Sequence, residues 1–398
     1  NNGTDKEYIT GIKGKTYNLR DGKVVETDLQ KSNIFTEKST DNLTHTKIAF
    51  PEVGEGSIVE LRYTIESPFL YNLQSWDFEA KIPKLHSEFI TDIPTICTYN
   101  VSMKGGKGLS THHTAPYDTK IATSNGDVSG VRTTYIMKDM PAFVEEEYMT
   151  ASNNFISRIT FELASFSIPF GPSHNYTRTW ADVDKTLHDS DNFGNELKKK
   201  NLFKTIIPEI TNAEMSDYDK ANTIYEYIRH NIKWNQKYGI FTDNGVKKAL
   251  ELKNGNVADI NIALICALQA AGYDANPIIL STRGNGYPSF THAALSNFNY
   301  TIAHLKLGED YYLLDAADAN TAFGLIPHKC INFQGRNITK PESNWVDLTA
   351  SLPSRVGHMF EGSLDAVGTV SGYLHTSYYG DAANNRREEI KKFNSLEE

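Results

Sequence analysis

The chain has 398 residues, 39% of them apolar and 22% charged, which is an ordinary composition for a globular protein of two or three domains. Its formal net charge of −9 makes nucleic acid an unexpected partner, and no apolar run approaches the roughly 20 residues that a transmembrane helix needs. The cysteines Cys97, Cys266 and Cys330 lie far apart and form no C-x-x-C pair, so we expect neither a disulfide framework nor a zinc site. The chain begins at Asn1 within strand-like sequence, which indicates a trimmed chain without a visible signal peptide.

Residues 1–170 are predicted to form an all-β domain, most simply a β-sandwich. Arg20-Asp21-Gly22-Lys23 has the composition of a two-residue hairpin turn. Residues 57–66 alternate between apolar and polar side chains, which predicts an antiparallel strand with one buried face. That face would carry Val59, Leu61, Tyr63 and Ile65.

Residues 171–350 are predicted to form an α+β domain in which helices precede antiparallel strands. Helical spacing runs from Trp180 to Lys200 and from Val246 to Leu252. Ser216 and Asp219 form a helix-start signal, and a buried strand is expected at 277–280. The rest, residues 351–398, begins as a β segment and ends in charged, helix-like sequence, which predicts the start of a third, C-terminal β domain.

The most informative segment is the apolar helix expected after Gly255-Asn256 and ended by Gly272. A helix N-terminus favours a thiolate, because the dipole and the free N–H groups stabilise an anion. Enzymes place a nucleophilic cysteine there, but this chain has Val257, which carries no nucleophilic atom.

The segment resembles the transglutaminase-like superfamily, whose motif is a cysteine entering a helix, a histidine opening a strand and an aspartate ending the next strand. Gly255 and Ala258-Asp259 match, while Val257 stands in place of the cysteine. Tyr300 stands in place of the histidine, and Asp315 is kept. The resemblance implies a papain-like, cysteine-protease type of core with a degenerate triad.

A narrower resemblance extends over most of residues 10–390. The segments Phe50–Glu60, Ser67-Pro68-Phe69 and Leu325–Asn332 are similar to a Bacteroidetes group in which an uncharacterised β domain precedes a transglutaminase-like core. This resemblance implies a secreted, periplasmic or cell-surface protein and a longer C-terminal β domain. It also implies that members lacking the cysteine are common.

The register of the two strands that carry Tyr300 and Asp315 follows from the turn between them. A two-residue turn at Gly308-Glu309 makes Leu307 face Asp310 and Ile302 face Asp315. Tyr300 and His304 are then both diagonal neighbours of Asp315, about 7–8 Å away. We expect Asp315 to accept a hydrogen bond from the Tyr300 hydroxyl, and a His304–Asp315 dyad is the alternative.

Other residues of this region are candidates for a ligand groove. Trp234, Asp259, Arg283 and His304 are expected around it, and such a groove suits a peptide or a glycan. No H-E-x-x-H motif and no glycine-rich phosphate loop occurs, so we expect neither a metal nor a cofactor.

The sequence therefore favours a non-catalytic envelope protein that binds or assembles with an unknown peptide, protein or glycan. One alternative is an active transglutaminase-like cysteine peptidase or acyl-transferase with an unconventional nucleophile, for which Cys330, near His328, is the first candidate. Another is a carbohydrate- or peptide-binding protein in which the N-terminal β domain holds the ligand.

Overall fold

The computed structural model describes residues 6–40, 43–69, 73–123, 126–147, 149–167, 173–175, 179–289, 293–350 and 352–393. By contact density the chain divides into two units: Asn1–Gln74 with Phe161–Leu163, and Ser75–Thr160 with Ala164–Glu398. The predicted domain boundaries at residues 171 and 351 lie outside the described residues and stay predictions.

The first unit contains an antiparallel sheet of order β2-β1-β5 and a separate β3–β4 pair. The hairpin predicted at Asp21-Gly22 is confirmed, because Arg20 pairs with Lys23 and both turn residues have positive φ. The strands are β1 Tyr8–Arg20, β2 Lys23–Asp28, β3 Ile34–Thr40, β4 Leu43–Ile48 and β5 Ile58–Glu66.

The predicted burial of one face of β5 is wrong. The strand pairs antiparallel with β1 as expected, but the side chains of Val59, Leu61, Tyr63 and Ile65 are 39–50% exposed. Alternation indicates which side chains share a face. It does not supply the second layer that would remove this face from water.

Two further sheets precede the helices. One has the order β7-β10-β9, and the other has the order β12-β11-β6 with β8 paired to β11. Between residues 6 and 175 the described residues form strands and two short 3₁₀ turns, which confirms the all-β prediction; their packing as a sandwich stays a prediction. The strands are β6 Trp76–Asp77, β7 Lys84–Pro94, β8 Cys97–Lys104, β9 Thr111–Thr123, β10 Gly126–Met140, β11 Arg158–Ser167 and β12 Ser173–Asn175.

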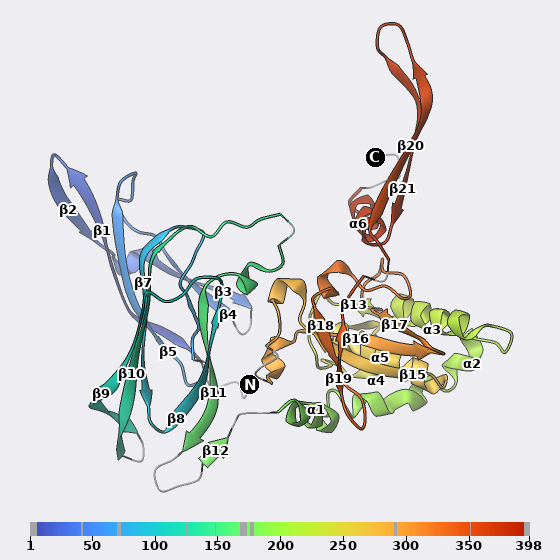
Figure 1. The fold of residues 1–398 in the computed structure, drawn as a ribbon, viewed down its shortest axis with the longest axis horizontal. Helices are drawn as coiled ribbons and strands as arrows, with labels where there is room; N and C mark the ends of the chain where they lie inside the picture. Colours follow the sequence, from blue (N-terminus) through green and yellow to red (C-terminus); the bar gives the residue numbers. More distant parts are fainter. Residues whose placement is uncertain are drawn as a thin grey trace. The chain divides into compact units, whose positions relative to one another are not determined.

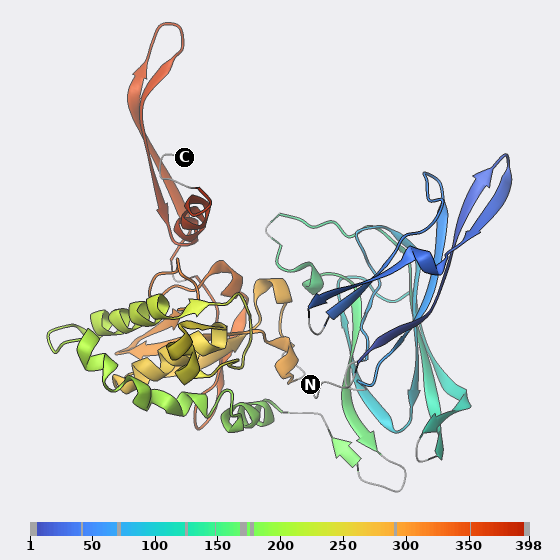
Figure 2. The same ribbon diagram turned by 180° about the vertical axis from the view of Figure 1, so that it is seen from behind.

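The predicted α+β core is confirmed as a five-stranded antiparallel sheet of order β17-β16-β15-β18-β19. Figures 1 and 2 show α3, α4 and α5 behind and then in front of this sheet, so they cover one of its faces. The core helices are α1 Trp180–Asp189, α2 Ile206–Ile210, α3 Asp217–Asn231, α4 Val246–Leu252 and α5 Val257–Ala270. The strands are β13 Lys233–Trp234, β14 Asn254–Gly255, β15 Asp274–Leu280, β16 Tyr300–Leu307, β17 Asp310–Leu314, β18 Gln334–Asn337 and β19 Asn344–Asp347.

Helix α5 is the centre of the core, and its ends follow from local sequence. The Asn256 side chain accepts the Asp259 N–H at 2.8 Å, and Gly272 ends the helix with a φ of +94°. Every residue from Val257 to Leu268 is buried, because α5 packs against β15 and β16 as well as against neighbouring helices. The predicted Ser216 cap of α3 is also confirmed, since its hydroxyl accepts the Asp219 N–H at 3.1 Å.

The helix predicted over residues 180–200 is too long. Helix α1 stops at Asp189, and a 3₁₀ segment forms at Glu196–Phe203. The intervening Ser190-Asp191-Asn192 sequence favours turns, because these side chains hydrogen-bond nearby backbone groups.

The C-terminal part contains a two-stranded ribbon, β20 Arg355–Leu364 with β21 Val370–Tyr379, followed by α6 Asp381–Ile390. The predicted β segment is thus confirmed, with a turn at 365–369. The helical prediction for the charged end, residues 386–398, is confirmed only in part, because α6 begins earlier, at Asp381, and residues 394–398 lie outside the described residues.

Candidate functional site

The first turn of α5 holds the position expected for a nucleophile. Val257 is the first helical residue and is fully buried, and its N–H points to the carbonyl of Lys237 at 3.3 Å. The cap is reciprocal, because the Asp259 carboxylate accepts the Asn256 N–H at 2.9 Å. The helix end is therefore occupied by protein groups and presents an apolar side chain instead of a thiol.

Asp259 does not line a groove, which corrects the prediction. Its fully buried carboxylate also accepts the N–H groups of Gly245 at 2.9 Å and Asn244 at 3.1 Å, so it ties the loop before α4 to α5. Burial raises its pKa, and these backbone hydrogen bonds lower it. Gly255 is required beside it, because a Cβ at that position would lie 2.6 Å from the Asp259 Cβ.

Strands β16 and β17 bring Tyr300 and Asp315 together in the predicted register. Leu307 pairs with Asp310 and Ala303 with Leu314, and Gly308 has a φ of +59°. The Tyr300 hydroxyl donates to Asp315 Oδ2 at 2.8 Å, and both side chains are fully buried. The predicted hydrogen bond is confirmed.

The other carboxylate oxygen of Asp315 is also occupied. Oδ1 accepts from Asn261 Nδ2 at 2.8 Å and from the Ala317 N–H at 3.0 Å. Asn261 lies on α5 one turn after Val257, and its Oδ1 accepts the Ala316 N–H at 2.9 Å. Asn261 is not among the predicted site residues, although an amide in an otherwise apolar helix is a signal for a buried hydrogen bond.

The surroundings of Tyr300 keep its phenol protonated. Burial raises the pKa of Asp315, while Asn261, Lys329 and Tyr300 oppose that rise. Burial and the adjacent Asp315 charge hold the pKa of Tyr300 well above its usual value. The phenol therefore stays protonated and donates its hydrogen bond, so Tyr300 cannot serve as a base near neutral pH.

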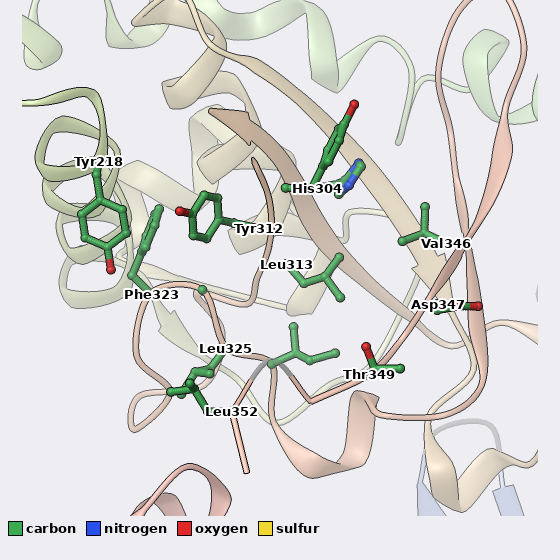
Figure 3. A pocket seen from close by; sticks show the side chains of 13 residues that line it. Tyr218, His304, Tyr312, Leu313, Phe323, Leu325, Val346, Asp347, Thr349 and Leu352 are labelled. Carbon is green, nitrogen blue, oxygen red and sulfur yellow. The ribbon is translucent and has the colours of Figure 1, made fainter. Parts of the chain in front are cut away.

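The structure corrects the His304–Asp315 alternative. Among the described residues, His304 makes no hydrogen bond to Asp315; its ring stacks on Tyr311 with centroids 5.1 Å apart. His304 instead lines a separate pocket of about 430 Å³, with Leu313 and Val346 (Figure 3). Burial lowers its pKa, so it is neutral at pH 7.

The pKa of each of the three thiols is raised by burial. Burial raises the pKa of Cys266 to about 12, and its Sγ donates to the carbonyl of Glu196 at 3.3 Å. Cys330 is fully buried, and burial, reinforced by the Asp315 charge, holds its pKa well above the usual value. Burial also raises the pKa of the partly exposed Cys97.

An aromatic cage, formed by the rings of Trp234, Tyr238 and Tyr300, lies beside this buried network. The ammonium group of Lys329 lies 4.4, 5.6 and 5.4 Å from these three ring centroids, respectively. It also lies 3.9 Å from Asp318 Oδ2. The sequence predicted Trp234 here but missed Tyr238, Asp318 and Lys329, because only the folded chain brings them together.

Arg283 belongs to the same neighbourhood through the backbone. Its Nη1 donates to the carbonyl of Ile331 at 3.1 Å, which ties the 3₁₀ turn Arg283–Asn285 to the segment after the turn His328–Cys330. The structure thus places Trp234, Tyr300 and Arg283 around one region, with Asp259 inside the core and His304 in another pocket.

The described residues contain no cluster of histidine, cysteine, aspartate and glutamate side chains positioned to hold a metal ion. Within the same residues, no helix is both long enough and apolar enough to cross a membrane.

Comparison with known proteins finds a family match within the core. Residues 204–315 match the transglutaminase-like superfamily. The chain is similar to the crystal structure of a "putative protease" from Parabacteroides distasonis ATCC 8503, with a TM-score of 0.52 and 12% identity over 86% of this chain and 64% of that one. At this identity the similarity shows only the fold, which is a papain-like cysteine-protease type of core. The chain spans 64% of the length of that protein.

A "putative cysteine protease" from Cytophaga hutchinsonii gives a TM-score of 0.27 at 9% identity, over 77% of this chain and 93% of that one, which is too low to carry an argument. No curated protein matches the chain.

Proposed function

Residues 204–315 form a transglutaminase-like domain, and from this premise we propose that the domain is non-catalytic and binds a peptide or a glycan. One observation carries the proposal: the Asp315 carboxylate is fully buried and its two oxygens already accept three hydrogen bonds. A triad aspartate orients a histidine, which in turn activates a nucleophile. Here its partners are Tyr300 and Asn261, and the position entering α5 is Val257.

The absence of an activated thiol is the testable core of the proposal. We expect native-state alkylation with iodoacetamide, read by mass spectrometry between pH 5 and 9, to leave Cys266 and Cys330 unmodified. The reason is that both are buried and their thiolates are disfavoured. Cys97 should react no faster than a free peptide thiol with a pKa of about 8.5, which serves as the control.

Hydrolysis of a fluorescent casein substrate provides the second measurement. We expect no turnover above the level of a Cys97→Ala, Cys266→Ala and Cys330→Ala triple variant. Rapid alkylation of one cysteine at pH 6, together with turnover lost in the matching single alanine variant, would establish the cysteine-hydrolase alternative instead. Turnover that survives in the triple variant would also overturn the proposal, since it would require a different nucleophile.

We also propose a periplasmic or cell-surface location, which rests on the family resemblance. Labelling intact source cells with a membrane-impermeant amine reagent tests it. Modification of this protein without modification of cytoplasmic markers is expected, and protection equal to that of the markers would contradict it.

A further inference from the structure

The aromatic cage has the geometry of a cation site. The Trp234 and Tyr238 rings are nearly parallel, at an interplanar angle of 6°, with centroids 5.5 Å apart. The Lys329 ammonium lies 4.4 Å from the Trp234 centroid and 5.6 Å from the Tyr238 centroid. The two stacked rings therefore form one side of the cage, with Trp234 the nearer of the two to the ammonium.

Tyr300 supplies a second side of the cage. Its ring lies 5.3 Å from the Tyr238 ring at an interplanar angle of 64°, and its centroid is 5.4 Å from the ammonium. An ammonium within about 6 Å of a ring face is attracted by the ring quadrupole, and several rings around one cation form the arrangement that recognises organic ammonium groups.

Charge around the cage also selects a cation. Asp318 lies at its edge, and its Oδ1 accepts the N–H groups of Asn320 at 2.9 Å and Thr321 at 3.2 Å, so the backbone fixes this carboxylate independently of Lys329. The buried Asp315 lies behind Tyr300. A carboxylate ligand would meet two acids, and a neutral sugar would gain ring contacts but no charge attraction.

Lys329 is held in the cage weakly enough to be replaced. Over the part of the chain that the structure describes, its Nζ donates no hydrogen bond, and its carboxylate neighbour is 3.9 Å away. The side chain of Lys329 is 26% exposed and that of Tyr238 is 46% exposed, so one side of the cage opens to solvent. The flexible stem of a lysine can leave while the backbone of the turn His328–Cys330 stays in place.

We propose that the aromatic cage is a binding site for an organic ammonium group, the lysine side chain or amino terminus of a peptide partner, and that Lys329 occupies it in the unliganded protein. This inference rests on the proposed binding function and narrows its ligand from a peptide or glycan to a basic peptide. It also gives Tyr300 a second role, because the residue in the histidine position forms a wall of the site.

Choline is the probe, because its quaternary ammonium fits a cage, and 3,3-dimethyl-1-butanol is its uncharged analogue. We expect Lys329→Ala to bind choline at least about ten-fold more tightly than the wild type in calorimetric titrations, because the competing internal cation is gone. The uncharged analogue should bind Lys329→Ala at least about ten-fold more weakly than choline does. Lys329→Ala/Trp234→Ala should lose choline binding.

Lys237→Ala is the matched control. Lys237 lies between Trp234 and Tyr238 in the chain. Its side chain is exposed, and its ammonium lies 3.7 Å from Asp243 rather than in the cage. Its replacement should leave choline affinity unchanged. Equal choline affinity of the wild type and Lys329→Ala, or equal binding of choline and its analogue, would overturn the proposal.

A measurement on the wild type keeps the proposal testable if Lys329→Ala fails to fold. Choline at saturating concentration should speed acetylation of Lys329 by sulfosuccinimidyl acetate at least about three-fold, because the displaced side chain enters water. The acetylation rate of Lys237 should not change. An unchanged rate at Lys329 would refute the proposal that Lys329 occupies the cage and is displaced by the ligand. These readouts are separate from cysteine alkylation: a reactive thiol would overturn the non-catalytic function, whereas failed choline binding would overturn only the cage.

Discussion

Two antiparallel hairpins of this protein show why an apolar pattern does not by itself imply burial. In β16–β17 the apolar side chains of Ile302, Leu305 and Leu314 are fully removed from water. In β20–β21 the pairing also gathers apolar side chains on one face, but they are 45–70% exposed. These are Val356, Phe360, Leu364, Val370 and Leu374.

The difference comes from what surrounds each hairpin. Helix α5 packs against β16, and β15 continues the sheet beside it. Within the described residues, β20 and β21 pair only with each other. An isolated two-stranded ribbon is marginally stable in water. The burial of an apolar side chain in a hairpin therefore depends on the layer that covers the hairpin more than on the strand sequence.

The largest expected difference between the hairpins lies in their aspartates. Asp315→Ala should lower the free energy of unfolding by about 3–5 kcal/mol, because Asn261, Tyr300 and the Ala317 N–H would each become a buried donor without an acceptor. Urea denaturation measures the loss.

Asp365→Ala is the matched control in the ribbon turn, where an exposed carboxylate accepts the Thr369 and Val367 N–H groups at 2.8 and 3.0 Å. Water can replace this carboxylate, so its loss should be much smaller. Equal losses in the two variants would show that the buried network contributes nothing beyond an ordinary turn.

The sequence predicted the parts of the core whose cause is local. The Asn256 cap and Gly272 fixed the ends of α5, and the Gly308 turn fixed the register that joins Tyr300 to Asp315. These features depend on hydrogen bonds and dihedral angles within a few residues.

The parts that the sequence could not predict depend on distant contacts. Lys329 reaches Trp234 across 95 positions, and no periodicity records that meeting. His304 and Asp315 lie on or next to the paired strands β16 and β17, but the His304 ring stacks on Tyr311 and lines another pocket. The exposure of β5 has the same origin as that of the ribbon, since alternation cannot report whether a covering layer exists.

The pKa values of the same two aspartates should be shifted in opposite directions. Burial raises the pKa of Asp315, whereas backbone N–H groups, that of Thr369 first, lower the pKa of Asp365. The pH-dependent part of the Asp315 contribution to stability, which comes from this raised pKa, is therefore present below its unfolded pKa of about 3.9 and is lost as the pH rises through its folded pKa. The contribution of Asp365 is present above about 3.9 and is lost as the pH falls through its folded pKa.

Carboxyl carbon NMR between pH 2 and 8 measures both midpoints, with Asp315→Asn and Asp365→Asn for assignment. Tyr300→Phe should raise the Asp315 midpoint further, because the hydroxyl that stabilises the carboxylate is removed. A midpoint for Asp315 below that of Asp365 would contradict the burial argument.

The smallest expected effect is also the most direct test of the exposed face. Leu364 on the ribbon is 70% exposed, so Leu364→Ser should change the free energy of unfolding by no more than about 0.5 kcal/mol. Leu305→Ala in β16 is the buried counterpart and should cost about 2–5 kcal/mol, because it leaves a cavity in the hydrophobic core. If Leu364→Ser instead cost more than about 1 kcal/mol, the ribbon face would have to be covered in solution, since a side chain already in water has little apolar burial to lose.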